Sequence, residues 1–240
     1  MIVIELTDLA WGLIPVFITL WLIQRWSISP KRALLAIARM LLQLLLIGYV
    51  LTYIFDSDSP LLISGILSVM LVAASWIALD SLPGRSLPMM GLSLLSVAGG
   101  GVFTLAVVTQ GVMHLEPWYK PSVIIPIAGM IFSNSMNTIS LAGERFFSEF
   151  ERDGDYTAAR NTAYQAAMIP VTNALMAVGL VSLPGMMTGQ ILSGVSPLIA
   201  ARYQIMVMLM IFGSSGISAA LFLMLLRRQA MAGRESAESA

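Results

Sequence analysis

Amide and hydroxyl side chains interrupt the apolar stretch between residues 123 and 143. Their spacings of three and four residues place most of them along one face of a helix. Two interpretations remain open. The amides bond neighbouring helices, each bond contributing about 0.6–2 kcal/mol, or their oxygens line a translocation path across a membrane. The polar row consists of Met130, Asn134, Asn137, Leu141 and Glu144, with Ser133 and Ser140 beside it.

Leu183–Gln204 is rich in glycine and proline but too apolar for an ordinary loop. In a helix interior glycine costs about 1 kcal/mol and proline about 3 kcal/mol, so a single continuous helix is unfavourable. We predict a broken or re-entrant segment near 183–202, because irregular backbone at membrane depth is tolerated where it lines a cavity. The residues assigned to the break are Pro184, Gly185, Gly189, Gly194 and Pro197, and those assigned to the path are Met186, Met187, Thr188 and Gln190. An alternative role for Gly185 and Gly189 is to allow close packing of helices. For the two methionines, packing is an alternative to binding a soft metal ion.

The loop 144–162 carries five acidic and three basic residues, and its phenylalanines recur at helical spacing. We therefore predict a short amphipathic helix over Glu144–Arg152, a turn at Gly154, and Asp155 as the N-cap of the next helix. Such a helix is either an interfacial anchor or a plug for a groove on a partner. The residues assigned to coupling are Glu144, Arg145, Phe146, Phe147, Phe150 and Arg152.

Several kinds of chemistry are missing from the chain. The two lysines, Lys31 and Lys120, lie outside any glycine-rich phosphate loop. There is no cysteine and one histidine, His114, which we expect to be solvated in a loop. The carboxylates cluster in loops and at helix ends, whereas an ion-driven carrier would bury one at mid-membrane. We expect no enzymatic activity, no cofactor and an external source of energy; the metal ligands, if any, are unknown.

The composition requires a bilayer. Hydrophobic residues make up 58% of the 240 residues and charged residues 11%, with mean hydropathy +0.85, against about 25% charged residues in soluble domains. The net charge of zero gives no electrostatic footprint for nucleic acid. We predict an all-α polytopic membrane protein of about seven transmembrane helices. The predicted spans are 6–23, 33–55, 60–79, 89–109, 123–143, 163–182 and 203–226.

The basic residues predict an N-out, C-in orientation, since cytoplasmic loops carry the excess of lysine and arginine. With seven spans, Lys120 and Arg202 fall outside and all the others fall inside. We expect one transmembrane domain over 1–228, a cytoplasmic coupling loop over 144–162, and a polar, disordered tail over 229–240. The inside residues are Arg25, Lys31, Arg32, Arg39, Arg85, Arg145, Arg152, Arg160, Arg227, Arg228 and Arg234.

Three strings resemble the FetB-type ABC transporter permease family, which includes bacterial iron-export permeases and plant aluminium-tolerance proteins. They are LVSLPGMMTGQILSG at 180–194, PLIAARYQI at 197–205 and IPIAGMIFSNSMN at 125–137. The resemblance is strong over roughly 120–226 and general in the first half. One departure is DYTAARNTAYQAA at 155–167, which lacks the glycine of the family's coupling loop and is shorter.

The resemblance implies a permease subunit without its own ATPase, paired with a separate ABC ATPase subunit as a homodimer in the bacterial inner membrane. It further implies export of metal ions, with iron as the first candidate. Two alternatives stay open: an ABC permease for an organic or chelated solute, and a non-transporting interaction or sensor subunit.

Overall fold

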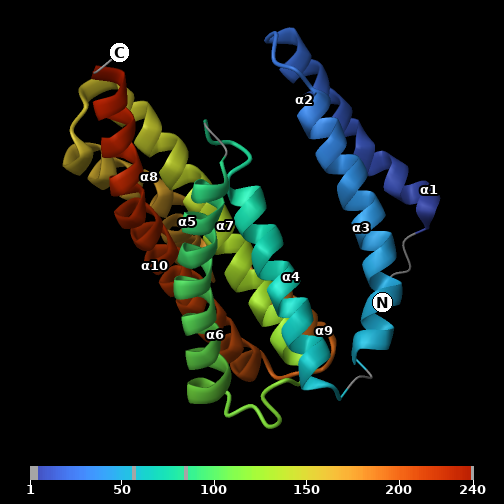
Figure 1. Cartoon of the computed structure of the whole chain (residues 1–240). Coiled ribbons are helices and arrows are strands. Elements are labelled where there is room, and N and C mark those ends of the chain that lie inside the picture. The colour runs from blue at the N-terminus through green and yellow to red at the C-terminus, as the bar shows by residue number, and fades with distance from the viewer. Residues whose placement is uncertain (1–4, 56–57, 84–85, 239–240) are drawn as a thin grey trace. The chain divides into compact units, whose positions relative to one another are not determined.

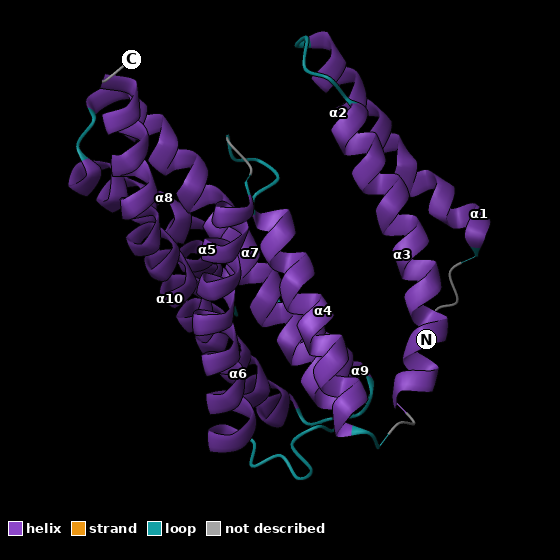
Figure 2. Cartoon of the chain, viewed as in Figure 1, coloured by secondary structure: helices purple, strands orange, loops and turns teal. Residues whose placement is uncertain are grey.

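The computed structural model describes residues 5–55, 58–83 and 86–238. This part of the chain is helical, with turns and loops between the helices and no β-strand among the described residues (Figure 2). The expected all-α class is therefore confirmed. The chain divides into two compact units, Met1–Asp56 and Ser57–Ala240, which are described separately.

The first unit is an antiparallel helical hairpin (Figure 1). It contains α1 (Leu6–Leu9), η1 (Ala10–Gly12), α2 (Leu13–Arg25) and α3 (Lys31–Phe55). Large apolar side chains such as Trp21 and Leu45 are exposed, at 61% and 68%. A surface this apolar requires lipid or another protein around it, as expected for a membrane-embedded hairpin.

The second unit is built around two long helices, α7 (Pro121–Asp153) and α10 (Pro197–Glu238). Helix α7 packs against α4 (Pro60–Ala78), α8 (Tyr156–Ala177) and α10, while α10 also contacts α5 (Leu87–Val97), α8 and α9 (Gly185–Leu192). The buried residues of α7 include Ile124, Ile131 and Ile139. Their helical spacing gives α7 one apolar face toward the centre of the unit.

The fourth predicted span is one helical run, Leu87–Val112, despite its three consecutive glycines. It passes from α5 through a π-helical turn at Ala98–Val102 (η2), the short α6 (Phe103–Ala106) and a second π-helical turn at Val107–Val112 (η3). A Cβ atom on Gly100 would lie 2.7 Å from the Ser218 nitrogen and 2.9 Å from the Ser214 oxygen. The glycines therefore permit η2 to lie directly against the backbone of α10.

The segment 183–202 is broken, as predicted. After α8 the chain turns through Gly179, forms the eight-residue α9 and turns again at Gly194 before α10 begins. Gly179 and Gly194 have φ of 83° and 91°, a conformation that glycine adopts without steric cost. A re-entrant course, in which the segment enters the membrane and leaves it on the same side, stays a prediction.

Each of the seven predicted spans coincides with a helical region, but they are not equivalent. Among the residues that the structure describes, five helices are long and apolar enough to cross a membrane: Lys31–Tyr49, Pro60–Ala78, Leu87–Val112, Pro121–Asp153 and Pro197–Arg227. Ala10–Arg25 is apolar but shorter, and α8 ends at Ala177, before the predicted limit of 182. The number of membrane crossings and the single domain over 1–228 stay predictions.

The C-terminal tail differs from the expectation of disorder. Helix α10 continues to Glu238, because Gln229–Glu238 contains alanine, arginine and glutamate, which are strong helix formers, with one glycine. The side chains of residues 228–240 lie outside the described part of the structure.

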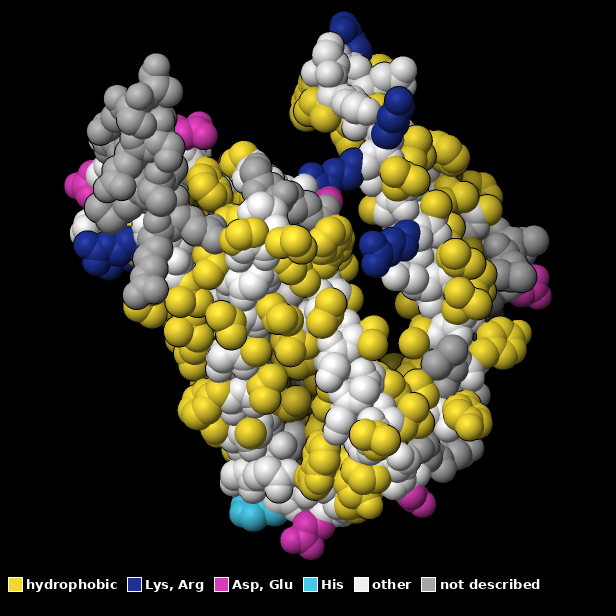
Figure 3. All heavy atoms as spheres, viewed as in Figure 1, with side chains coloured by type: hydrophobic (Ala, Val, Ile, Leu, Met, Phe, Trp, Pro, Cys, Tyr) yellow, Lys and Arg dark blue, Asp and Glu magenta, His cyan; other side chains and the backbone are white. Residues whose placement is uncertain are grey.

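The charged side chains of the second unit lie toward its two ends. On the face shown in Figure 3, hydrophobic side chains cover the length between them. Arg160 and Arg227 meet at one end, both near the ring of Tyr156, whereas Lys120 precedes α7 at the opposite end of that helix. Arg85 and the side chains of Arg228 and Arg234 lie outside the described residues, and the N-out orientation stays a prediction.

Candidate translocation site

The polar row on α7 divides into two kinds of contact. Ser140 donates a hydrogen bond of 2.8 Å to the Ala78 oxygen of α4, so this hydroxyl joins two helices. Ser133 and the Asn134 amide instead donate to the Met130 oxygen of their own helix, at 3.2 and 2.8 Å. Asn137 makes no side-chain hydrogen bond in the described part of the chain. The asparagines therefore do not bond neighbouring helices here.

Asn134 and Asn137 line a cavity of about 200 Å³ between α7, α8 and α10. This places two amides on one wall, while the other walls are largely apolar. Asn137 is exposed and Asn134 is half-buried. The full set of lining residues is Asn134, Asn137, Thr138, Leu141, Ala167, Pro170, Val171, Ala174, Met208 and Ile211.

The bonds that hold α7 to α10 lie elsewhere on the helix. Ser218 donates a hydrogen bond of 3.1 Å to Ser135, and both residues are fully buried. Neither serine was a candidate in the sequence, because small hydroxyl residues are common in apolar helices and carry no periodic signal there. Gly100 packs against the same turn of α10. The face toward α10 is thus held by small residues, as is usual between membrane helices.

In the broken segment, the proposed path residues have different surroundings. Met187 lines a second cavity, between α8, α9 and α10, together with Gln204 and Met208. Met186, Thr188 and Gln190 are partly exposed. The Thr188 hydroxyl donates to the Pro184 oxygen at 3.2 Å within α9, and Gln190 has a buried oxygen without a partner. Met208 lines both cavities, which makes it the shared wall between them.

The glycine pair Gly185 and Gly189 does not pack closely against the rest of the chain. A Cβ atom at either position would meet nothing within 4 Å. The alternative of close intramolecular helix packing is therefore wrong for this pair. A larger side chain at Gly189 has free space within the described chain, so overpacking is not expected from these contacts.

The predicted coupling loop begins inside α7 rather than as a separate helix. Helix α7 runs without interruption to Asp153, and Gly154 ends it with φ of 67°. The predicted N-cap is confirmed: the Asp155 carboxylate accepts hydrogen bonds from the Thr157 and Ala158 nitrogens, at 2.7 and 3.2 Å. The turn at residues 154–155 is therefore the short connection between α7 and α8.

The aromatic residues of this region point mainly inward. Phe146 is fully buried, stacks on Phe150 with centroids 5.4 Å apart and contacts Tyr156 edge to face. Phe147 and Phe150 are half-buried. Phe146 is thus a core residue and is not presented to a partner. The physical reason is that the chain reverses direction at Gly154, so that the start of α8 packs against the end of α7. The apolar face of the expected amphipathic helix is therefore an interior surface.

A buried carboxylate was also missed. Glu149 is 6% exposed and pairs with Arg145 and Arg152, both at 2.5 Å. Two of the basic residues assigned to coupling therefore hold an acidic neighbour, while Glu144 is exposed. The spacing of three and four residues was the available signal.

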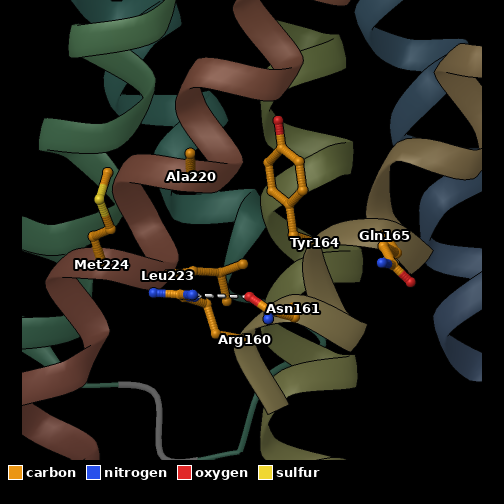
Figure 4. Close-up of a pocket in the computed structure, with 7 residues that line it drawn as sticks. All are labelled: Arg160, Asn161, Tyr164, Gln165, Ala220, Leu223 and Met224. Atoms are coloured by element: carbon orange, nitrogen blue, oxygen red, sulfur yellow. Dashed lines mark hydrogen bonds between the residues drawn. The ribbon is translucent and has the colours of Figure 1, made fainter. Parts of the chain in front are cut away.

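A third cavity, of about 350 Å³, lies beside this turn between α8 and α10. Figure 4 shows Arg160 next to Asn161 and Leu223, and the guanidinium nitrogens of Arg160 donate to the Asn161 oxygen at 2.9 and 3.1 Å. Tyr164 and Gln165 come from the same helix. One wall is therefore polar and the α10 wall is apolar.

The described residues contain no group of three or more His, Asp or Glu side chains placed to hold a metal ion. Divalent iron favours carboxylate and imidazole ligands. The cavity at Asn134 and Asn137 contains amide and hydroxyl oxygens as possible ligands for an ion. Contacts of this kind would be weak and readily reversed.

Comparison with known proteins places the chain in a family. The model of an uncharacterised protein family, UPF0014, matches residues 6–231. The chain belongs to this family. A UPF0014 membrane protein from Synechocystis sp. is 34% identical over 235 residues, covering 91% of this chain and 90% of that protein. No solved structure matches the chain.

Two other relatives carry more specific names. The probable iron export permease protein FetB of Escherichia coli is 31% identical, over 78% of this chain and 77% of that protein. The Arabidopsis thaliana protein ALUMINUM SENSITIVE 3 is 31% identical, over 76% of this chain and 71% of that protein. These relatives confirm the resemblance to FetB-type proteins, and together with the apolar helices they establish a multi-pass membrane protein.

Proposed function

We propose that this chain is the membrane permease subunit of an ABC transporter that exports metal ions, with iron as the first candidate cargo. A separate subunit hydrolyses ATP, and the chain itself needs no cofactor. The observation that carries the proposal is the cavity at Asn134 and Asn137, which puts amides on the wall of a space within the helical bundle rather than in bonds between helices.

The chemistry of this cavity suits passage more than storage. Asn137 is exposed and its amide has no side-chain hydrogen bond in the described part of the chain, so it is free to bind a hydrated or partly hydrated cation. Without a cluster of carboxylates in the described residues, an ion is held weakly and can leave. An exporter needs that property, because the cargo must be released on the far side.

The turn between α7 and α8 is suited to transmit motion. Glu144 and Glu151 are exposed near it, while Phe146 and Tyr156 anchor it in the core. Helix α7 is continuous over 33 residues, from this turn to the cavity and beyond. A displacement of the turn by a partner ATPase would therefore move the wall that carries Asn134 and Asn137.

The relatives support the same conclusion. A probable iron export permease covers most of the chain at 31% identity. An ABC machine combines two membrane halves with two ATPases, so we propose a homodimer of this chain in the bacterial inner membrane.

The proposal is tested by reconstitution. The chain and a candidate partner ABC ATPase are placed in proteoliposomes, and ATP-dependent movement of Fe²⁺ is measured with active and with catalytically inactive ATPase. We expect Fe²⁺ to move only when the ATPase subunit is catalytically active. Movement driven by an ion gradient without ATPase would indicate a secondary carrier. ATPase binding without movement of any solute would indicate an interaction subunit.

A further inference from the structure

A second cavity, of about 340 Å³, lies between the end of α8, helix α9 and the first turns of α10. It differs in character from the cavity at the asparagines, because its lining is almost entirely hydrocarbon and thioether. No charged side chain lines it. Its lining residues are Leu175, Val178, Gly179, Leu183, Met187, Ala201, Gln204, Ile205, Met208 and Leu209.

Gln204 is the one polar side chain in this lining. The residue is 6% exposed, and its amide oxygen Oε1 is buried without a hydrogen-bond partner. Rotation by half a turn about the Cγ–Cδ bond exchanges the amide oxygen and nitrogen, so either can face the cavity. An unpaired buried amide is costly, and native structures usually supply a partner for such a group.

We propose that this cavity binds a small, uncharged, mainly apolar molecule that carries one hydroxyl or amide group, and that Gln204 is its hydrogen-bond partner. The volume favours an organic ligand, since one water takes about 30 Å³ in the liquid and a bare ion would leave most of the space empty. No charged residue lines the cavity, so a charged group placed in it would have no counter-ion there, which favours an uncharged ligand.

The site is distinct from the cavity at Asn134 and Asn137 but adjoins it through Met208, which lines both cavities, and it includes Met187, one of the residues assigned to the path from the sequence. Binding here requires neither ATP nor a partner subunit. The inference therefore stands or falls separately from the proposed transport function.

The test compares thymol with para-cymene, which share a carbon skeleton and differ by one hydroxyl. Binding to the full chain in phosphatidylcholine nanodiscs is measured by equilibrium dialysis, with empty nanodiscs subtracted. We expect thymol to bind roughly three- to tenfold more tightly than para-cymene, the range of one hydrogen bond. In Gln204→Leu this preference should disappear. The matched control Gln43→Leu, at an exposed position of α3, should keep it.

A second variant tests the cavity itself. Ala201→Phe fills the space next to Gln204 and should weaken binding of both molecules by at least tenfold. Equal binding of thymol and para-cymene to the natural protein would overturn the proposal, because it would indicate an unselective space for lipid chains. A preference for thymol that survives Gln204→Leu, or unaltered binding to Ala201→Phe, would also overturn it.

Discussion

The hydroxyl of Tyr156 donates a hydrogen bond of 2.8 Å to the main-chain oxygen of Leu223. The two residues are 67 positions apart, and the bond fixes the start of α8 to α10. The Arg160 and Arg227 guanidinium groups lie 5.8 and 5.5 Å from the centre of the same ring, close enough for a cation–π attraction. One tyrosine thus connects α7, α8 and α10 beside the proposed coupling turn.

Tyr156→Phe removes this bond and keeps the ring. We expect a loss of roughly 0.5–1.5 kcal/mol in unfolding free energy, measured by denaturant unfolding in detergent. We also expect weaker stimulation of the partner ATPase by cargo, since the turn is less firmly tied to α10. Tyr203→Phe is the control, because the Tyr203 hydroxyl has no protein partner in the described structure. Equal effects of the two substitutions would contradict this role.

Gly100→Ala tests the close approach of η2 to α10. The added Cβ would meet backbone atoms of Ser214 and Ser218 within 3 Å, so the two helices must separate. We expect a loss of roughly 1–3 kcal/mol and a lower thermal midpoint.

Gly91→Ala provides the comparison within the same helical run, at a position where a Cβ meets nothing within 4 Å. It should be neutral or stabilising by about 0.5–1 kcal/mol, because alanine favours helix more than glycine does. If Gly100→Ala is as stable as Gly91→Ala, the helices are further apart than described.

Replacing Asn134 and Asn137 together by leucine tests the path. We expect ATP-dependent transport to be abolished, because the wall of the cavity loses both amides, while the protein remains inserted and folded. Transport in proteoliposomes and the thermal midpoint are measured together. Asn173→Leu, at an exposed position of α8 outside this cavity, should transport normally. Unchanged transport in the double variant would show that the amides do not serve passage.

Phe146→Ala tests whether the aromatic cluster is interior. The side chain is fully buried, and its loss should cost about 3–5 kcal/mol of stability. Phe103→Ala, at a side chain 60% exposed, should cost little in lipid. Urea unfolding of both variants in detergent provides the measurement. A mild effect at Phe146 would mean that the end of α7 does not pack on α8 and Tyr156.

Glu144→Lys tests the docking surface without disturbing the core. Glu144 is exposed near the C-terminal end of α7, and reversal of its charge should reduce co-purification of the ATPase subunit severalfold with the thermal midpoint unchanged. Glu116→Lys, near the opposite end of the helix, should leave co-purification intact. Equal recovery of the ATPase with both variants would place the dock elsewhere.

The helical class and the positions of the helices could be predicted, because long apolar runs bounded by charges leave few alternatives in a bilayer. The break near 183–202 was predictable for the same kind of reason, since glycine and proline have large and known costs in a helix. The N-cap at Asp155 followed from local chemistry alone, which depends on a few neighbouring residues.

The site was less predictable because it depends on contacts between distant segments. Asn134 and Ser140 have similar signals in the sequence, yet one lines a cavity and the other joins α7 to α4. The spacing of Phe146 is that of an amphipathic helix and predicts a surface residue, because the spacing alone does not reveal what covers the apolar face. No pattern in the sequence singles out Gln204, because its importance comes from the missing hydrogen-bond partner of its buried amide oxygen.

The two glycines with positive φ, Gly179 and Gly194, set off a segment whose first residues are outside the packed bundle: Leu180 is 90% exposed and Val181 is 85% exposed. The chain contains no cysteine, so a thiol introduced at Val181 would be unique without any other change. Its reaction with a membrane-impermeant maleimide, in intact cells or in inverted vesicles, would report directly which side of the membrane this segment faces.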